Sequence, residues 1–259
     1  MTFPVAAMQT LISARDRSFN YGDGIFTTIQ VRGGSIQLWP LHLQRLQHSA
    51  AQLGFGAIDW QSVQQQAQAA ITAAEQVIKI LISRGEGGRG YATADVTAPG
   101  IYISVSAMPD YRLAQQQGIS LGMATLKLAV QPLLAGLKHN NRLEQVLLKQ
   151  ELAHTAYDDL LVLDQQGFIT EVSAANVFLH RDGVWHTPEL RRAGVAGVMR
   201  QHILQQADIT LINWGITELA SVDAIFICNA LMGIVPVRSI EGRALSVSKV
   251  QQFSKQVLC

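Results

Sequence analysis

The chain has few cysteines and no long apolar run. Cys228 and Cys259 are its two cysteines among 259 residues, and they form no Cys-x-x-Cys pair. We therefore expect no structural disulfide, and the composition suits a reducing cytoplasm. No apolar run approaches the length of a membrane span. The mildly apolar segment 3–12 lacks the basic start of a signal peptide, so we expect it to belong to the fold.

Net charge and metal-ligand motifs are also scarce. The 20 Lys and Arg residues nearly balance the 19 Asp and Glu residues, which leaves a formal net charge of +1. Because the basic residues are dispersed, the sequence argues against a nucleic-acid-binding face. The seven histidines show no His-Glu-x-x-His or other ligand spacing, so no metal site is predicted. A small molecule is the expected partner.

The sequence does contain alternating strand-like and helical segments, with 48% hydrophobic residues. In the first part, we expect strands over 25–31, 35–39, 77–83 and 101–106, and helices over 40–53 and 59–74. In the second part, we expect strands over 119–130, 160–164, 168–172, 176–180, 209–213, 223–228 and 234–238. Helices are expected there over 141–155 and 197–207, and from 246 onward. This pattern predicts a mixed α/β fold, and Pro109-Asp110 marks the best candidate for a linker between domains.

Lys138 stands out among the six lysines of the chain. It lies between the apolar run 119–130 and a helix whose predicted inner face carries Leu143, Val146, Leu147 and Leu152. A lysine between a buried strand and a buried helix is desolvated, which lowers the pKa of its amine and frees a lone pair. A Schiff-base lysine needs this property, although a lysine buried for packing has the same surroundings.

Four further features have both a functional and a simpler interpretation. The segment 194–201, GVAGVMRQ, suits phosphate binding at a helix start, but it also suits an ordinary tight turn. Glu171 ends an apolar strand and either faces a cation or lies at a solvated hairpin tip. Arg45 is mid-helix, where a surface arginine is the simpler interpretation. Arg84 and Arg89 occupy a glycine-rich loop that suits a carboxylate clamp or a mobile tip.

In order along the chain, the motifs resemble a known family. They are FNYGDGIFTT, HLQRL, SRGEGGRGY, LKHNNRLEQ, TEVSAANVF, GVAGVMRQ and CNALMGIVPV. Together they resemble the pyridoxal phosphate (PLP) enzymes of fold type IV, the group of branched-chain and D-amino acid aminotransferases. SRGEGGRGY and LKHNNRLEQ are most similar to the 4-amino-4-deoxychorismate lyases of that group.

The resemblance implies a fold and a cofactor site. A small N-terminal α/β domain (1–106) and a linker (107–113) would precede a larger C-terminal domain (114–259), with PLP in the cleft between the domains. Lys138 would hold PLP as a Schiff base, and Glu171 would face the pyridine nitrogen. The phosphate would lie against Arg45, backbone groups of Gly197, Val198 and Met199, and the turn that contains Asn229 and Ala230. Ala230 replaces a threonine of many relatives, so the contact there would rest on backbone groups.

The resemblance also implies a substrate side. Thr28 matches a hydroxyl that assists proton transfer. Arg89 and Tyr91 match a loop that in relatives reaches a neighbouring subunit's site to bind substrate carboxylate, which implies a homodimer. Arg84 and Tyr21 are assigned to the same substrate side. The expected reaction converts 4-amino-4-deoxychorismate to p-aminobenzoate and pyruvate, a step toward folate.

Two alternatives stay open from the sequence. A fold type IV aminotransferase for branched-chain or D-amino acids needs the same lysine, glutamate and phosphate site. Thr28 and the loop from Arg84 to Tyr91 favour the lyase over this alternative. A protein that binds PLP or another ligand without turnover is the second alternative, and Lys138 and Glu171 argue against it because a binder needs neither.

Overall fold

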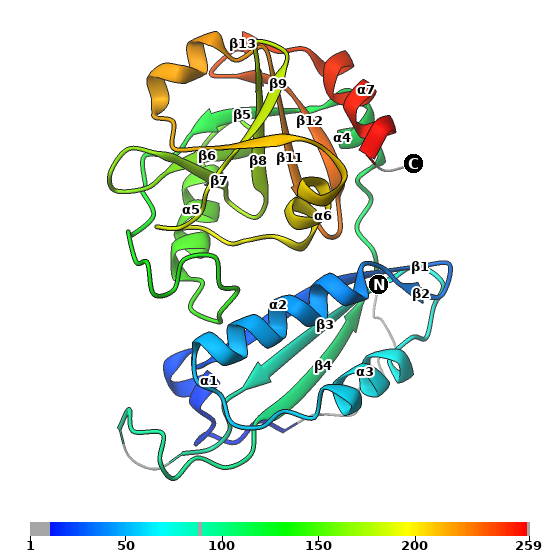
Figure 1. Cartoon of the computed structure of the whole chain (residues 1–259), viewed down its shortest axis with the longest axis vertical. Coiled ribbons are helices and arrows are strands. Elements are labelled where there is room, and N and C mark those ends of the chain that lie inside the picture. The colour runs from blue at the N-terminus through cyan, green and yellow to red at the C-terminus, as the bar shows by residue number, and fades with distance from the viewer. Residues whose placement is uncertain (1–10, 88–89, 258–259) are drawn as a thin grey trace.

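The computed structural model describes residues 11–87 and 90–257. Arg89, Cys259 and residues 3–10 lie outside these ranges, so the predictions made for them stay predictions. Two sheets built from separate parts of the chain make up the fold (Figure 1). The mixed α/β class predicted from the sequence is confirmed. No helix within the described ranges is long and apolar enough to cross a membrane.

The first sheet is antiparallel and has the order β2-β1-β3-β4. Its strands are β1 (Gly24–Arg32), β2 (Ser35–Ile36), β3 (Gln76–Ser83) and β4 (Gly100–Ser106). Alternating β-branched residues in β1 and β3 favour extended chain and bury one face. Helices α2 (Trp39–Gln52) and α3 (Trp60–Ala69) contribute to the same core, which includes Ile25, Ile29, Leu46, Val63, Ile78 and Ile80.

Strand β1 pairs with β2 over two residues only. Another part of this edge of the first sheet pairs with residues from the second half of the chain. Ile25 forms an isolated antiparallel bridge with His139. The Phe26 N–H donates to the Lys138 carbonyl oxygen at 3.0 Å, and the Asn140 N–H donates to the Gly24 carbonyl oxygen at 2.9 Å. Backbone hydrogen bonds therefore dock the residues around Lys138 on the first sheet.

The second sheet is mixed and has the order β10-β9-β8-β11-β12-β5-β6-β7, with β13 paired to β12. Its strands are β5 (Ile119–Met123), β6 (Asp159–Leu163), β7 (Ile169–Val172), β8 (Asn176–Arg181), β9 (Val184–Pro188), β10 (Ile209–Ile212), β11 (Ala224–Asn229), β12 (Gly233–Ile240) and β13 (Arg243–Ala244). Helices α6 (Val198–Gln206) and α7 (Val247–Val257) pack on it through an aromatic cluster in which the Phe178 and Phe226 rings stack at 4.5 Å. A second cluster, which includes Val177, Ile225 and Val237, forms another part of the core.

The predicted strand 119–130 is wrong in its second half, because β5 ends at Met123. The chain continues as a loop whose N–H groups bond to a helix. Glu151 of α5 (Leu143–Leu152) accepts hydrogen bonds from the backbone N–H groups of Thr125 and Leu126, at 2.6 and 3.2 Å. Side-chain carboxylates can satisfy backbone donors where no strand ladder does. Apolar content alone does not distinguish these two arrangements.

The predicted inner face of α5 is also wrong. Leu143 is 76% exposed, Val146 and Leu147 are about half exposed, and Leu148 is fully buried. Glu144, close to Leu148 on the helix surface, accepts a hydrogen bond from the backbone of the loop after β5. These polar contacts orient α5 so that its apolar stripe faces outward.

Five short elements escaped prediction: the helices α1 (Arg17–Tyr21) and α4 (Arg112–Gln117), the 3-10 helix η1 (Ile216–Ser221), and the strands β9 and β13. Along the chain, the first sheet ends at Ser106 and the second begins at Ile119. Helix α4 begins inside the predicted linker 107–113. Figure 1 shows the chain crossing there between the lower and upper parts of the molecule. The exact domain bounds stay a prediction.

Candidate functional site

A cavity of about 400 Å³ is lined by residues from both parts of the chain. Eight of the residues predicted for the site line it: Thr28, Arg45, Lys138, Glu171, Gly197, Val198, Asn229 and Ala230. Met199 is buried, and its side chain packs in the aromatic cluster beside α6. The structure therefore gathers residues that lie far apart in the sequence around one space.

Lys138 is the buried amine of this cavity. Burial, followed by the positive charges of Arg45 and Arg142, lowers its pKa to about 7, although the charge of Glu171 acts in the opposite direction. Its Nζ atom lies 4.5 Å from the centre of the Phe26 ring. A lysine with this pKa has a large fraction of free amine near neutral pH, which makes it a nucleophile.

Glu171 lies on β7 and is 5% exposed, so it is not at a solvated hairpin tip. Burial raises the pKa of its carboxyl group to about 7, while a hydrogen bond from the Val195 N–H at 2.8 Å and the charge of Arg142 favour the ionised form. A buried carboxylate is stable when a cation faces it. A protonated ring nitrogen in the cavity would supply that cation.

Arg45 is buried and belongs to a side-chain network that the sequence analysis missed. Its Nη2 donates to Thr27 Oγ1 at 2.5 Å, and Thr27 Oγ1 lies 2.6 Å from His42 Nδ1. Burial, with the charges of Arg45 and Lys138, lowers the pKa of His42 well below its usual value, so the ring is neutral. The Thr27 hydroxyl can therefore donate to His42 Nδ1 while accepting from Arg45. The only sequence signal was the i, i+3 spacing of His42 and Arg45 on one helix.

Arg45 also retains a free donor for a ligand. Its buried Nε has no hydrogen-bond partner among the described residues. Burial lowers the pKa of its guanidinium to about 10, so the group stays charged at neutral pH. A buried cation with an unused donor is suited to an anionic ligand such as phosphate.

The start of α6 offers a second set of donors. Gly197 is the N-cap and provides no side-chain hydrogen bond, so the first N–H groups of the helix are open to an anion. The Gly197 N–H itself donates to Asn176 Oδ1 at 3.1 Å, and Asn176 Nδ2 donates to the Val195 carbonyl oxygen at 2.7 Å. A Cβ atom on Gly197 would collide with Asn176 Oδ1. The glycine therefore permits the close approach that forms this helix entrance.

Several cavity residues were missed or left without a role by the sequence analysis. They are Phe26, Tyr111, Arg142, Gln145, Ser173, Ala174, Ala175, Asn176, Val195, Cys228 and Leu231. Gln145 Oε1 and Ser173 Oγ are buried without a hydrogen-bond partner among the described residues, which leaves polar capacity for a ligand. No three His, Cys, Asp or Glu side chains within 11–87 and 90–257 are arranged to hold a metal ion.

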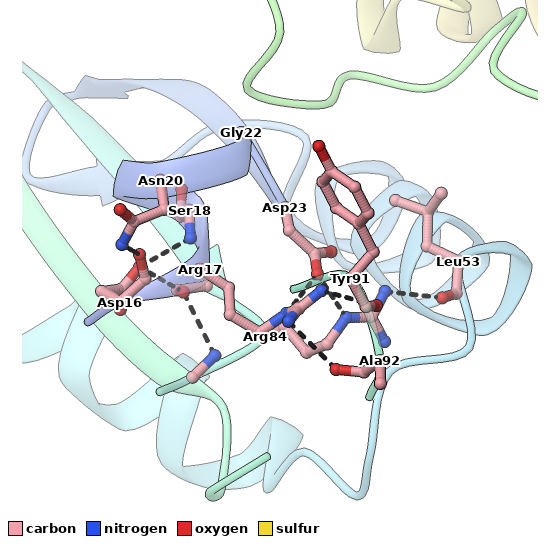
Figure 2. A network of polar contacts seen from close by, with 12 residues as sticks. Asp16, Arg17, Ser18, Asn20, Gly22, Asp23, Leu53, Arg84, Tyr91 and Ala92 are labelled. Carbon is pink, nitrogen blue, oxygen red and sulfur yellow. Dashed lines mark hydrogen bonds and ion pairs between the residues drawn. The ribbon is translucent and has the colours of Figure 1, made fainter. Parts of the chain in front are cut away.

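The structure places Arg84 outside the cavity, in an ion-pair network with Asp23 and Arg17 (Figure 2). Its Nε donates to Asp23 at 2.7 Å, and its other nitrogens donate to the Leu53 and Gly54 carbonyl oxygens. Burial raises the pKa of Asp23, but the bonds from both arginines outweigh it and hold that pKa below its usual value. These contacts occupy the Arg84 donors, and its role in substrate binding stays a prediction.

Tyr21 and Tyr91 also lie outside the cavity. Their rings meet edge to face with centres 5.3 Å apart, and Tyr91 is 83% exposed. Arg17 donates to the carbonyl oxygens of Gly90, Tyr91 and Ala92, which fixes the chain that carries Tyr91. Neither side chain lines this chain's own cavity, and the predicted role of both in substrate binding stays a prediction.

The model of the family described as Amino-transferase class IV matches residues 24–240. The chain belongs to this family. Lys138 of LKHNNRLEQ and Glu171 of TEVSAANVF line the same cavity.

Individual relatives differ in activity. The chain is 40% identical over 239 residues to an aminodeoxychorismate lyase of Vibrio harveyi, covering 90% of this chain and 88% of that protein. The crystal structure of 4-amino-4-deoxychorismate lyase from Pseudomonas aeruginosa has 38% identity and a TM-score of 0.89, covering 95% of this chain and 94% of that one. A D-alanine aminotransferase of Bacillus licheniformis is 23% identical over 256 residues, covering 95% of this chain and 89% of that protein.

Replacing Thr27 with valine should weaken PLP binding. The change keeps the shape but removes the hydroxyl that links His42 to Arg45, so we expect a loss of about tenfold, the size of one hydrogen bond to a charged group. Absorbance titration of the apoprotein with PLP measures the affinity. Thr27→Ser keeps the hydroxyl and should bind nearly as the wild type does. Equal affinity of the valine variant and the wild type would show that the network does not position Arg45.

Proposed function

We propose that this class IV protein is an aminodeoxychorismate lyase, which uses PLP to convert 4-amino-4-deoxychorismate to p-aminobenzoate and pyruvate. The observation that carries the use of PLP is the burial of Lys138 and Glu171 in one cavity with Arg45 and the uncapped start of α6. Similarity to lyases over about nine-tenths of the chain supports this reaction over others of the family.

The residues of the cavity fit PLP by charge and by unused hydrogen-bonding capacity. Arg45 and the first N–H groups of α6 would hold the phosphate. Glu171 would face the ring nitrogen, and Lys138 would bind the aldehyde carbon. When bound, PLP supplies a sink for the electrons that remain after a proton leaves the carbon bearing the substrate's amine.

The chain's own residues then position groups and move protons. The Lys138 amine, whose pKa burial lowers to about 7, takes the proton from the amine-bearing carbon. The bond between the adjacent ring carbon and the ether oxygen breaks, the ring becomes aromatic and the enolpyruvyl group departs. A proton from Lys138 goes to the methylene carbon of that group and yields pyruvate. Thr28, which lines the same cavity, is suited to relay it.

The lyase activity is tested by incubation with aminodeoxychorismate and detection of p-aminobenzoate by fluorescence. We expect product from the wild type, and a yellow colour that borohydride bleaches as it reduces the Schiff base and fixes the cofactor to the chain. Lys138→Ala should lose both the product and the colour. Lys149→Ala is the matched control, because this α5 lysine has a half-exposed side chain and lies outside the cavity.

The alternative is an aminotransferase, but the 23% identity to a D-alanine aminotransferase does not favour it over the lyase, to which the chain is 40% identical. It would use Lys138, Glu171 and Arg45 in the same way, so the cavity does not separate the two. The same samples distinguish them when 2-oxoglutarate and an amino donor are added. Formation of glutamate without any p-aminobenzoate from aminodeoxychorismate would reject the lyase.

The pKa of Lys138 predicts how fast the apoprotein captures PLP at each pH. Below about pH 7 the amine is protonated and cannot attack the aldehyde, so capture is slow; above it the amine is free and the rate levels off. A lysine of ordinary pKa, about 10.4, would instead give a rate still rising at pH 9. Stopped-flow absorbance from about pH 5.5 to about pH 9.5 records the profile, because this range spans the lowered pKa and ends below the ordinary lysine pKa.

A homodimer forms part of the proposal, as does a cytoplasmic location. The 83% exposed Tyr91 is held by Arg17 away from its own cavity, a placement suited to a neighbouring subunit's site. Multi-angle light scattering should give a mass about twice 28.3 kDa. A monomer mass at concentrations where the enzyme is active would reject the shared site. For location, the protein should appear in the cytoplasmic fraction on cell fractionation.

A further inference from the structure

Three consecutive backbone carbonyl oxygens, at and beside the reactive lysine, all accept hydrogen bonds. The Lys138 oxygen accepts from the Phe26 N–H at 3.0 Å. Both neighbouring oxygens accept from one side chain: Arg142 Nε donates to His139 O at 2.8 Å, and Arg142 Nη2 donates to Leu137 O at 3.4 Å. The guanidinium therefore spans the lysine on one side while β1 binds it on the other.

Arg142 has no assigned part in the proposed reaction, although its side chain lines the cavity. Among the described residues, no carboxylate lies within ion-pair distance of its guanidinium, so its hydrogen bonds go to backbone carbonyls. Burying a guanidinium without an ion-pair partner is unfavourable, and burial lowers its pKa. The hydrogen bonds that this cation donates to backbone carbonyl oxygens offer an explanation for its burial.

We propose that Arg142 is a positioning residue, which fixes the backbone on both sides of Lys138 and so sets the direction in which the lysine side chain enters the cavity. This inference rests on the proposed Schiff-base role of Lys138. A lysine has four side-chain torsions, and a mobile backbone would add further freedom that must be lost before reaction. Fixing the backbone in advance removes that part of the barrier, and a misplacement of about 1 Å can lower a rate about 100-fold.

The charge of Arg142 acts in the same direction as its geometry. After burial and Arg45, it is the next contribution that lowers the pKa of Lys138. It also favours the ionised form of Glu171, against the effect of burial on that pKa. One guanidinium thus favours both a free amine and a charged carboxylate at the same pH, which a neutral side chain of similar size would not do.

Two variants separate the hydrogen bonds from the charge. Arg142→Lys keeps a positive charge but loses the planar fork that reaches two carbonyls. Arg142→Met removes both. Arg191→Met is the matched control, because the Arg191 side chain is 80% exposed and lies outside the cavity. Circular dichroism and thermal melting establish which variants fold. If Arg142→Met does not fold, Arg142→Lys alone tests the role of the backbone hydrogen bonds.

Hydrogen exchange of the apoprotein tests whether Arg142 holds the backbone around Lys138. The amides of Phe26 and Asn140 bond to carbonyls at this junction, so their exchange should rise several-fold in both Arg142 variants and stay unchanged in the Arg191 control. The pH profile of PLP capture tests the effect of the Arg142 charge on the pKa of Lys138. Its midpoint should move to higher pH in Arg142→Met and stay near the wild-type value in Arg142→Lys.

Steady-state kinetics distinguish positioning from substrate binding. We expect both Arg142 variants to lower kcat, by about 10- to 100-fold, with little change in KM for aminodeoxychorismate. Unchanged exchange and an unchanged capture midpoint, together with a raised KM, would overturn the proposal and make Arg142 a carboxylate-binding group. If the wild type forms no p-aminobenzoate, the proposed function fails, yet exchange and PLP capture still confirm or reject the positioning role.

Discussion

Desolvation of the Lys138 amine is the interaction on which the site depends. An ammonium group removed from water beside Arg45 and Arg142 loses its proton easily, and this is the chemical property a Schiff-base lysine needs. The same surroundings are unfavourable for folding, because each buried charge carries a penalty of several kcal/mol. Hydrophobic clusters on both sheets stabilise the fold enough to hold this unfavourable arrangement.

The second requirement is that the cavity keeps hydrogen-bonding groups unsatisfied by the chain itself. Arg45 Nε, Ser173 Oγ and Gln145 Oε1 are buried without partners among the described residues. Buried polar atoms are normally paired, so their presence in one cavity indicates a ligand that completes them. Binding of such a ligand stabilises the folded chain by mass action.

The sequence predicted much of the fold and of the central site, for identifiable reasons. Runs of β-branched residues give β1 and β3 irrespective of context, and Lys138, Glu171 and Arg45 were recognised by type and order and do share the cavity. The outward stripe of α5 was not predictable in the same way. Helical periodicity shows that Leu143 and Val146 share a face, but the loop that bonds to Glu144 decides which face is covered.

The arginines show the same limit. SRGEGGRGY does not reveal that Asp23, 61 positions from Arg84 in sequence, binds that arginine and turns it away from the cavity. Thr27 and His42 were missed because a contact between a strand residue and a helix residue produces no periodic pattern in the sequence. Pairings between distant polar residues are fixed only when the backbone is placed, whereas apolar patterns are local.

The bridge between Ile25 and His139 limits how the molecule can open. With the bonds from Phe26 to Lys138 and from Asn140 to Gly24, it joins the reactive lysine's backbone directly to the edge of the first sheet. A wide hinge motion about the connection near Tyr111 would have to break these bonds and carry the lysine away from Thr28. Any motion that separates the two sheets must therefore break backbone hydrogen bonds on both sides of the reactive lysine's strand contact.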